Sequence, residues 1–266
     1  MGVSPEPGYP APSGSLSYTR DGAIGILELA RPDKRNALDL ATIRGLEQFF
    51  TSPPPDVRCI VLGAQGDHFS AGLDLSEMTE RNAQSGIAHS MLWHRAFEAI
   101  EFGTLPVVAA LHGAVVGGGL ELAIATHLRV ADETAFFALP EGVRGLFTGG
   151  GGSVRLPRLI GRARMMDMML TGRVYDAREG EAIGMTQYVV EAGGARAKAI
   201  EFARRIATNA PMSNFAILQG LPRIAEAPPE IGYLTESLIA SVAQSDTEAK
   251  ARMADFLEKR AAKVRG

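Results

Sequence analysis

The sequence has a single cysteine, no excess of positive charge and no long apolar run. One cysteine, Cys59, excludes an intramolecular disulfide, and its apolar neighbours suggest a buried core residue. The net charge of -3 argues against a nucleic-acid partner, because nucleic-acid-binding domains are usually clearly basic. No apolar run could span a bilayer, and the first residues lack the features of a secretory signal. We therefore expect a cytoplasmic protein without membrane or nucleic-acid partners.

Several common site motifs are also missing. The glycine runs do not fit G-x-G-x-x-G, because Leu122 and Val154 occupy the places of the last glycine, and no P-loop lysine follows Gly152. The segment around Ser70 lacks the first glycine of a nucleophile elbow. The 5 histidines lack H-E-x-x-H spacing. We therefore expect no metal site and no separate cofactor.

The order of apolar and helical patterns indicates an α/β protein. Residues 1–13 are rich in proline, glycine and serine and are interpreted as a flexible tail. Residues 16–29 look like a hairpin turned at Asp21-Gly22. Further strands are predicted at 59–62, 107–111, 127–130 and 135–137, and helices at 40–50, 88–100, 118–125 and 153–160. Strands separated by helices favour parallel pairing with right-handed crossovers.

Beyond residue 194 only helical patterns remain. They predict helices at 195–209, 212–225, 231–243 and 247–263, interrupted by Pro211 and by the pair Pro228-Pro229. A helical region of this kind often docks on the α/β body or on a neighbouring subunit.

The most informative segment is the glycine run at 117–119, which opens a predicted buried helix. The first turn of a helix leaves N–H groups without partners, and with the helix dipole these groups favour an oxyanion. Glu121 lies three residues after Gly118, so its carboxylate can stand at the same helix end. The alternative is structural: the glycines allow close packing, and the glutamate belongs to a capping box.

The segment that follows the strand at 59–62 supplies a second candidate donor. Ser70, Ala71 and Gly72 suit a tight strand-to-helix turn, in which the N–H of Leu73 can bind an oxyanion and Asp74 can cap the helix. A plain capped turn is the alternative.

Glu141 is the second candidate acid or base. It follows an apolar strand and begins a glycine-rich passage, and burial there would raise its pKa and suit proton transfer near neutral pH. Alternatively, Glu141 forms an ion pair with an arginine such as Arg144. Trp93 and His94 are interpreted as packing residues.

Taken together, these segments resemble the enoyl-CoA hydratase/isomerase (crotonase) family. The matching motifs occur in the family's order: RPDKRNAL at 31–38, FSAGLDL at 69–75, GGGLELA at 117–123, PE at 140–141, GGGG at 149–152, RLPRLIG at 155–161 and FLEKR at 256–260. The resemblance implies a crotonase-like spiral of ββα units over residues 14–194. It also implies a C-terminal helical region over 195–266 that builds a homotrimer, or a dimer of trimers.

The resemblance also implies a site for an acyl-CoA thioester. It assigns the oxyanion hole to the backbone N–H groups of Leu73 and Gly118. It assigns the coenzyme A and substrate contacts to Lys34, Arg35, Ala37, Ala71, Asp74, Leu75 and Gly149, with Phe256 and Lys259 reaching the coenzyme A of a neighbouring subunit.

The choice of reaction depends on two positions. Hydratases of the family carry a glutamate at both Glu121 and Glu141, whereas many isomerases keep only the second. We predict syn hydration of a trans-2-enoyl-CoA, with Glu121 holding the water and Glu141 donating a proton to the α-carbon. The alternatives are a Δ3,Δ2-enoyl-CoA isomerase, an aromatic acyl-CoA hydratase-lyase, and an acyl-CoA-binding protein without turnover.

The chain departs from the family pattern at a few positions. Gly142 stands where a larger apolar residue is usual, Thr148 where proline is usual, and His112 where asparagine is common. Together with Arg144, the changes near Glu141 could alter its pKa or the shape of the acyl pocket.

Overall fold

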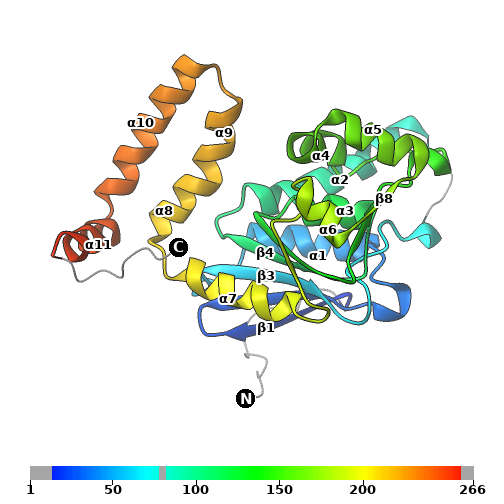
Figure 1. Ribbon diagram of the computed structural model, residues 1–266, viewed down its shortest axis with the longest axis horizontal. Helices are drawn as coiled ribbons and strands as arrows, with labels where there is room; N and C mark the ends of the chain where they lie inside the picture. The colour runs from blue at the N-terminus through cyan, green and yellow to red at the C-terminus, as the bar shows by residue number, and fades with distance from the viewer. Residues whose placement is uncertain (1–13, 78–81, 259–266) are drawn as a thin grey trace. The chain divides into compact units, whose positions relative to one another are not determined.

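A computed structural model describes residues 14–77 and 82–258 of the chain (Figure 1). The chain forms two compact units, Met1–Ala207 and Thr208–Gly266. The expected N-terminal tail at 1–13, and Lys259, lie outside the described residues. Within the described ranges, none of the helices has the length and apolar character needed to cross a lipid bilayer.

The first unit is built on a six-stranded sheet with the order β1-β2-β3-β4-β6-β9. Its strands are β1 (Leu16–Asp21), β2 (Ile24–Leu29), β3 (Cys59–Ala64), β4 (Val107–Leu111), β6 (Leu128–Asp132) and β9 (Tyr188–Val190). Only the β1–β2 hairpin in this sheet is antiparallel. Asp21 pairs with Ile24, so the turn residues are Gly22-Ala23, one position later than predicted.

A second, three-stranded sheet has the order β5-β7-β8, with β5 (Ala114–Val116), β7 (Phe136–Ala138) and β8 (Val174–Asp176). The chain alternates between the two sheets: β4 is followed by β5 and α3 (Gly118–Ile124), and β6 is followed by β7. The β4–β5 and β6–β7 passages each add one strand to both sheets, as expected for ββα units. The α/β class is confirmed.

The remaining helices of the first unit are α1 (Leu40–Thr51), α2 (Ala83–Glu101), α4 (Gly152–Ile160), α5 (Arg162–Thr171), α6 (Ala177–Ala182) and α7 (Ala195–Ala207). Short 3₁₀ turns lie at η1 (Pro32–Lys34), η2 (Leu75–Glu77) and η3 (Gly142–Arg144). The patterns had predicted α1, α2, α3 and α4 but no element between 161 and 194, where α5, β8, α6 and β9 occur.

The strands bury both faces, so the first unit has two apolar cores. Along β3 the side chains alternate: Ile60 and Leu62 belong to the larger core, and Cys59 and Val61 to the smaller. Cys59 is thus a core residue, and burial raises the pKa of its thiol to about 12.

Helix α7 covers the smaller core and packs against β2, β3, β4 and β6. It does so with an alanine at every fourth position, a spacing that puts small side chains on one helix face. These alanines are Ala195, Ala199, Ala203 and Ala207. Helix α7 therefore belongs to the first compact unit, which ends at Ala207.

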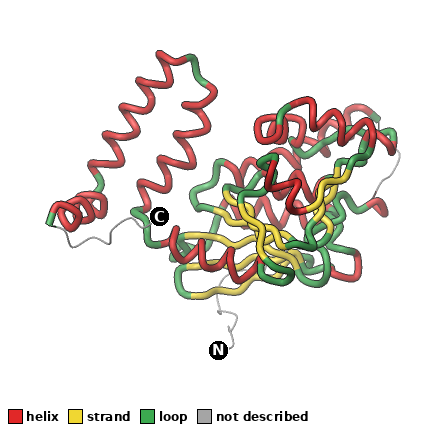
Figure 2. The backbone as a smooth tube through the Cα atoms, viewed as in Figure 1, coloured by secondary structure: helices red, strands yellow, loops and turns green. Residues whose placement is uncertain are grey.

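The second unit consists of helices in its described part, whereas the strands are confined to the first (Figure 2). Its helices are α8 (Pro211–Phe215), α9 (Leu221–Glu226), α10 (Pro229–Ser245) and α11 (Thr247–Leu257), with a π-helical segment at Ala216–Gly220 between α8 and α9. Pro211 and Pro229 each occupy a first helical position, where the missing N–H costs nothing.

Candidate active site

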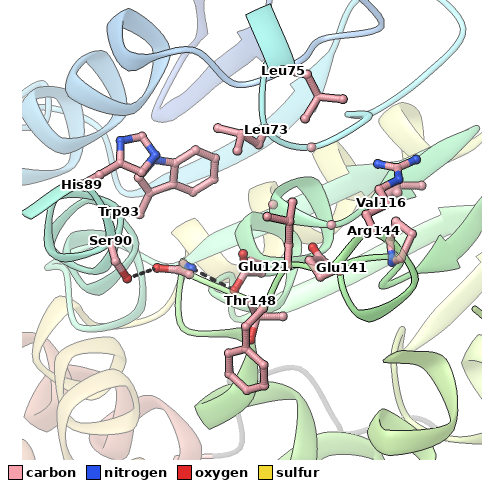
Figure 3. Close-up of a pocket in the computed structure, with 18 of the residues that line it drawn as sticks. Leu73, Leu75, His89, Ser90, Trp93, Val116, Glu121, Glu141, Arg144 and Thr148 are labelled. Atoms are coloured by element: carbon pink, nitrogen blue, oxygen red, sulfur yellow. Dashed lines mark hydrogen bonds between the residues drawn. The ribbon is translucent and has the colours of Figure 1, made fainter. Parts of the chain in front are cut away.

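A cavity of about 380 Å³ lies at the N-terminal end of α3 (Figure 3). It is lined by residues from four segments: 71–75, one face of α2, 116–121 and 140–150. Two of these segments continue from β5 and β7, which are parallel neighbours in the second sheet. Because the carboxyl ends of parallel strands meet at one edge, the topology brings these segments together.

Glu121 lies in the first turn of α3 and is only 3% exposed. Its Oε1 accepts hydrogen bonds from the backbone N–H groups of Gly150 (2.9 Å) and Gly152 (2.7 Å). It forms no capping box, because the cap of α3 is Gly117 and has no side-chain hydrogen bond. The two glycine runs of the sequence therefore meet at this carboxyl group.

Glu141 follows β7 and directly precedes η3. Its Oε2 is buried and has no hydrogen-bond partner among the described residues. Burial raises the pKa of Glu141, while its own backbone N–H and the charge of Arg144 act in the opposite direction. The described residues contain no ion pair between Glu141 and Arg144, so the structural alternative is not supported.

The two carboxyl groups line the same cavity (Figure 3). Burial raises the pKa of Glu121 to about 7, its backbone donors lower it, and the nearby charge of Glu141 raises it further. Both carboxyl groups therefore keep their protons to higher pH than an exposed glutamate does, and such groups suit proton transfer.

The predicted oxyanion donors are the backbone amides of Leu73 and Gly118, and both residues line the same cavity as the two carboxyl groups. The N–H of Leu38 donates to Gly72 O, and the N–H of Asp74 donates to Leu38 O. These two hydrogen bonds form a parallel β-bridge between Leu38 and Leu73, and in such a bridge the N–H of Leu73 points away from Leu38. The Leu73 nitrogen is 3.5 Å from the position that a Cβ on Gly118 would occupy. The Leu73 amide therefore lies close to Gly118, and an oxyanion hole formed by the two N–H groups stays a prediction.

Gly72 is required for this close approach. Its φ of +92° is in the left-handed region, and a Cβ there would lie 2.7 Å from Val116 O and 3.1 Å from Gly118 N. A side chain at this position would push the two amides apart.

Helix α2 contributes residues that the sequence reasoning did not assign to the site. Trp93 is 4% exposed, as expected for packing, but it packs on the beginning of α3: a Cβ on Gly118 would lie 2.6 Å from its ring. The Ser90 hydroxyl donates to Gly149 O over 2.5 Å. Gly86, Ser90 and Trp93 recur at helical spacing, and this periodicity was the signal that could have identified them.

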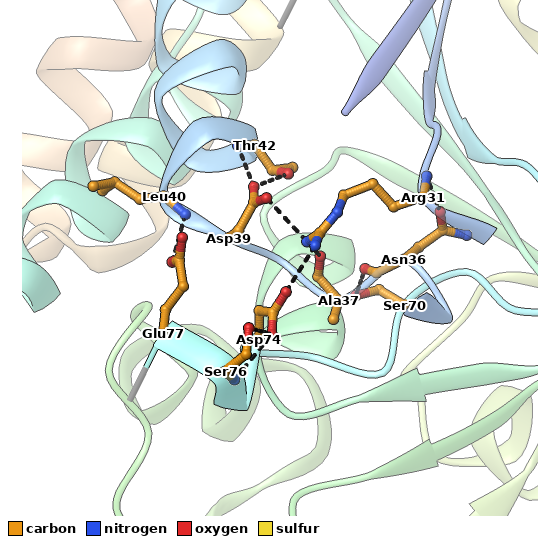
Figure 4. Close-up of polar contacts among 10 residues, drawn as sticks. All are labelled: Arg31, Asn36, Ala37, Asp39, Leu40, Thr42, Ser70, Asp74, Ser76 and Glu77. Carbon is orange, nitrogen blue, oxygen red and sulfur yellow. Dashed lines mark hydrogen bonds and ion pairs between the residues drawn. The ribbon is translucent and has the colours of Figure 1, made fainter. Parts of the chain in front are cut away.

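The segments that precede α1 and follow β3 are joined by Arg31 (Figure 4). Its guanidinium group contacts Asp74 (2.8 Å), Asp39 (3.0 Å) and the carbonyl oxygen of Ala37 (2.7 Å). The Ser76 hydroxyl and Arg31 hold the pKa of Asp74 below its usual value, against the effect of burial. Asp74 thus joins the two segments, a role that the sequence reasoning did not anticipate.

The residues assigned by resemblance to coenzyme A are brought together in part. Lys34 and Arg35 are exposed at η1, and the N–H of Ala71 donates to Arg35 O (2.9 Å). Ala71, Leu75 and Gly149 line the cavity itself. Phe256 belongs to the second unit and is 67% exposed. Lys259 lies outside the described residues.

Comparison with known proteins gives consistent matches over nearly the whole chain. The family model described as "Enoyl-CoA hydratase/isomerase" matches residues 19–266. The enoyl-CoA hydratase EchA19 of Mycobacterium tuberculosis is 32% identical over 247 residues, which cover 91% of this chain and 93% of that protein. The short-chain-enoyl-CoA hydratase of Clostridium acetobutylicum is 31% identical over 244 residues, covering 91% and 94%.

A solved structure is more similar still. The crystal structure of a proposed enoyl-CoA hydratase from Rhodopseudomonas palustris superposes with a TM-score of 0.91 and 56% sequence identity. The match covers 96% of this chain and 98% of that one.

Proposed function

The chain belongs to the enoyl-CoA hydratase/isomerase family, and we propose that it adds water to a trans-2-enoyl-CoA to give a 3-hydroxyacyl-CoA. The observation that carries this proposal is the pair of carboxyl groups, Glu121 and Glu141, on one cavity beside two backbone amides. The crotonase fold itself is shared by several reactions, so the proposal depends on this pair rather than on the fold.

In the proposed reaction, the thioester carbonyl oxygen accepts hydrogen bonds from the N–H groups of Leu73 and Gly118. Glu121, as carboxylate, takes a proton from water while the water oxygen bonds to the β-carbon. Negative charge then develops on the carbonyl oxygen, where each backbone donor contributes about 3 kcal/mol in well-studied enzymes. Glu141, as carboxylic acid, donates a proton to the α-carbon, and solvent returns one proton from Glu121 to Glu141.

The two glutamates on one cavity support a hydratase over an isomerase or a binding protein. Glu121 is only 3% exposed, and burying a carboxyl group lowers the stability of the fold. Such a group is typical of a catalytic site, and a protein that only binds acyl-CoA has no use for it. An isomerase moves one proton between two carbons and needs one such group, so Glu121 would be dispensable. A hydratase needs both groups, one for water and one for the α-carbon.

Turnover of crotonyl-CoA tests the proposal, with loss of the conjugated enoyl-thioester absorbance as the signal. We expect Glu121→Gln and Glu141→Gln each to lower the rate by about 10²–10⁴-fold, as for loss of a general acid or base. Glu98→Gln on the exposed face of α2 is the matched control and should keep the parent rate.

Each alternative gives a different result. If both glutamine variants hydrate as fast as the parent, the assignment is wrong. A Δ3,Δ2-isomerase would keep its activity in Glu121→Ala, and a hydratase-lyase would release an aldehyde. Tight binding of enoyl-CoA esters without product would support a binding protein.

We also propose that the second unit forms a homotrimer, alone or paired into a hexamer. Large apolar side chains on its helices are exposed in the single chain, and an accumulation of exposed apolar side chains supports association. They are Phe215, Ile217, Leu221, Ile231, Tyr233, Leu234, Leu238 and Val242. Phe256 and Lys259 would then approach the coenzyme A of a neighbouring subunit.

Light scattering during gel filtration tests this assembly. We expect Leu238→Glu, which puts a charge on the apolar face, to give smaller species than the parent. Gln244→Glu adds the same charge at another exposed position of α10 and should leave the mass unchanged. A monomeric parent protein would refute the trimer.

A further inference from the structure

An ion pair between a buried arginine and a partly exposed glutamate lies behind the turn that holds Glu121. Arg155, in α4, is 8% exposed, and its Nε donates to Oε2 of Glu101 at the end of α2 (2.6 Å). Its Nη1 donates to the carbonyl oxygen of Gly150 (3.1 Å). One guanidinium group therefore joins α2 to the first residue of the turn at 150–152.

The turn at 150–152 packs closely against the guanidinium group. Gly151 has a φ of +97°, and a Cβ there would collide with Nη1 of Arg155. The N–H groups on either side, of Gly150 and Gly152, both donate to Oε1 of Glu121. Arg155 thus acts on the carboxyl group through one intervening turn.

The backbone of Glu101, the acidic partner in the ion pair, is also held in place. His127 contacts the backbone carbonyl of Glu101 through Nε2 (3.1 Å), and its Nδ1 accepts the N–H of Val107 in β4 (2.9 Å). Burial lowers the pKa of His127 to about 4, so the ring is neutral at physiological pH. The contact with Glu101 therefore does not change with protonation of the ring in that range. A continuous set of contacts therefore runs from the main sheet to Glu121.

We propose that the Glu101–Arg155 ion pair positions Glu121, by holding the 150–152 turn with its two N–H groups directed at the carboxyl oxygen. Neither Glu101 nor Arg155 is among the residues that line the cavity in the described part of the chain. Both are therefore positioning residues and not catalytic ones. The kinetic part of this inference rests on the proposed hydratase function.

The proposal predicts a specific kinetic change. Backbone donors favour the ionised form of a carboxyl group. Loosening the turn weakens these hydrogen bonds, so Glu121 should bind its proton more tightly and become active as a base only at higher pH. Neither residue of the ion pair lines the described cavity, so KM should change little while kcat falls.

The experiment compares Arg155→Met, Arg155→Lys and Glu101→Gln with the parent. We expect Arg155→Met to lower kcat by about 100-fold, the effect of a displacement of about 1 Å at a reacting group. The acid limb of its pH–rate profile should move to higher pH. Arg155→Lys keeps the charge but not the fork of two donors, and should recover part of the loss.

Arg158→Met is the matched control, because Arg158 lies in the same helix but is exposed. It should keep the parent kcat and profile. Circular dichroism shows which variants fold. If Arg155→Met does not fold, Glu101→Gln decides, since its amide oxygen can still accept from Nε but carries no charge. Folded variants with the parent kcat and pH profile would overturn the proposal.

An infrared titration separates this inference from the proposed reaction. The difference spectrum between the parent and Glu121→Gln isolates the carboxyl band of Glu121. The same pair is then compared with Arg155→Met added to both proteins, and again with Glu101→Gln added to both. We expect the titration midpoint to rise in these backgrounds. An unchanged midpoint overturns the positioning role even if the enzyme hydrates enoyl-CoA, and a raised midpoint supports it even if the reaction is a different one.

Discussion

Replacing Glu121 by glutamine should stabilise the protein at alkaline pH while strongly lowering its activity. The side chain is 3% exposed, and burial raises its pKa from 4.5 to about 7. Above pH 7 the folded protein must keep a charged carboxylate in this buried position. Glutamine has nearly the same shape, remains neutral, and its carbonyl oxygen can still accept from Gly150 and Gly152.

The size of the effect follows from the pKa shift. Between pH 4.5 and 7 the folded protein keeps a proton on Glu121 that the unfolded chain has released. The stabilising contribution is therefore complete below pH 4.5 and is lost as the pH rises through 7. A shift of this size corresponds to about 3 kcal/mol in the free energy of unfolding.

Urea unfolding between pH 4 and 8.5 measures this difference at one protein concentration. The single tryptophan, Trp93, lines the cavity, so its fluorescence reports on the unit that contains Glu121. We expect the free energy of unfolding of the parent to fall relative to that of the variant by about 3 kcal/mol across the range. Parallel curves for the two proteins would refute the raised pKa of Glu121.

Two further substitutions test departures from the family pattern. In Gly142→Ala, the new Cβ would collide with the carbonyl oxygen of Met169 in α5, so η3 must shift beside Glu141; we expect a stability loss of about 1–3 kcal/mol in thermal melts and a lower kcat. Gly14→Ala, where a Cβ meets no atom within 4 Å, is the control, and equal melts for both would contradict the steric argument. In Thr148→Val, removal of a buried hydroxyl that has no partner among the described residues should raise stability by about 1 kcal/mol; a lower melting temperature would mean that the hydroxyl is paired in solution.

Local sequence patterns predicted the elements that are long enough to show a period. The helices α1 and α4 and the strand β4 begin and end within one residue of their predicted bounds. The elements that were missed are mostly three-residue strands and the short helix α6, in which too few residues occur to reveal a period. Helix α5 is longer, but its consecutive methionines blur the apolar face.

The role of the glycine runs was only partly visible in the sequence. The run at 117–119 was connected with Glu121 because the two are adjacent. The partners of its carboxyl group, Gly150 and Gly152, lie 29 and 31 residues further along the chain. No local pattern could indicate that pairing, and the capping box, a purely local alternative, was not what formed.

The sequence alone determined the α/β class, the family and the two acidic residues of the candidate site. These depend on periodicity and on short motifs, and both can be recognised in the linear sequence. Tertiary structure decided which donors hold Glu121, that Asp74 joins two segments through Arg31, and that α7 packs on the sheet. These features depend on contacts between distant segments, and such contacts exist only after the strands have paired and brought the loops to one edge.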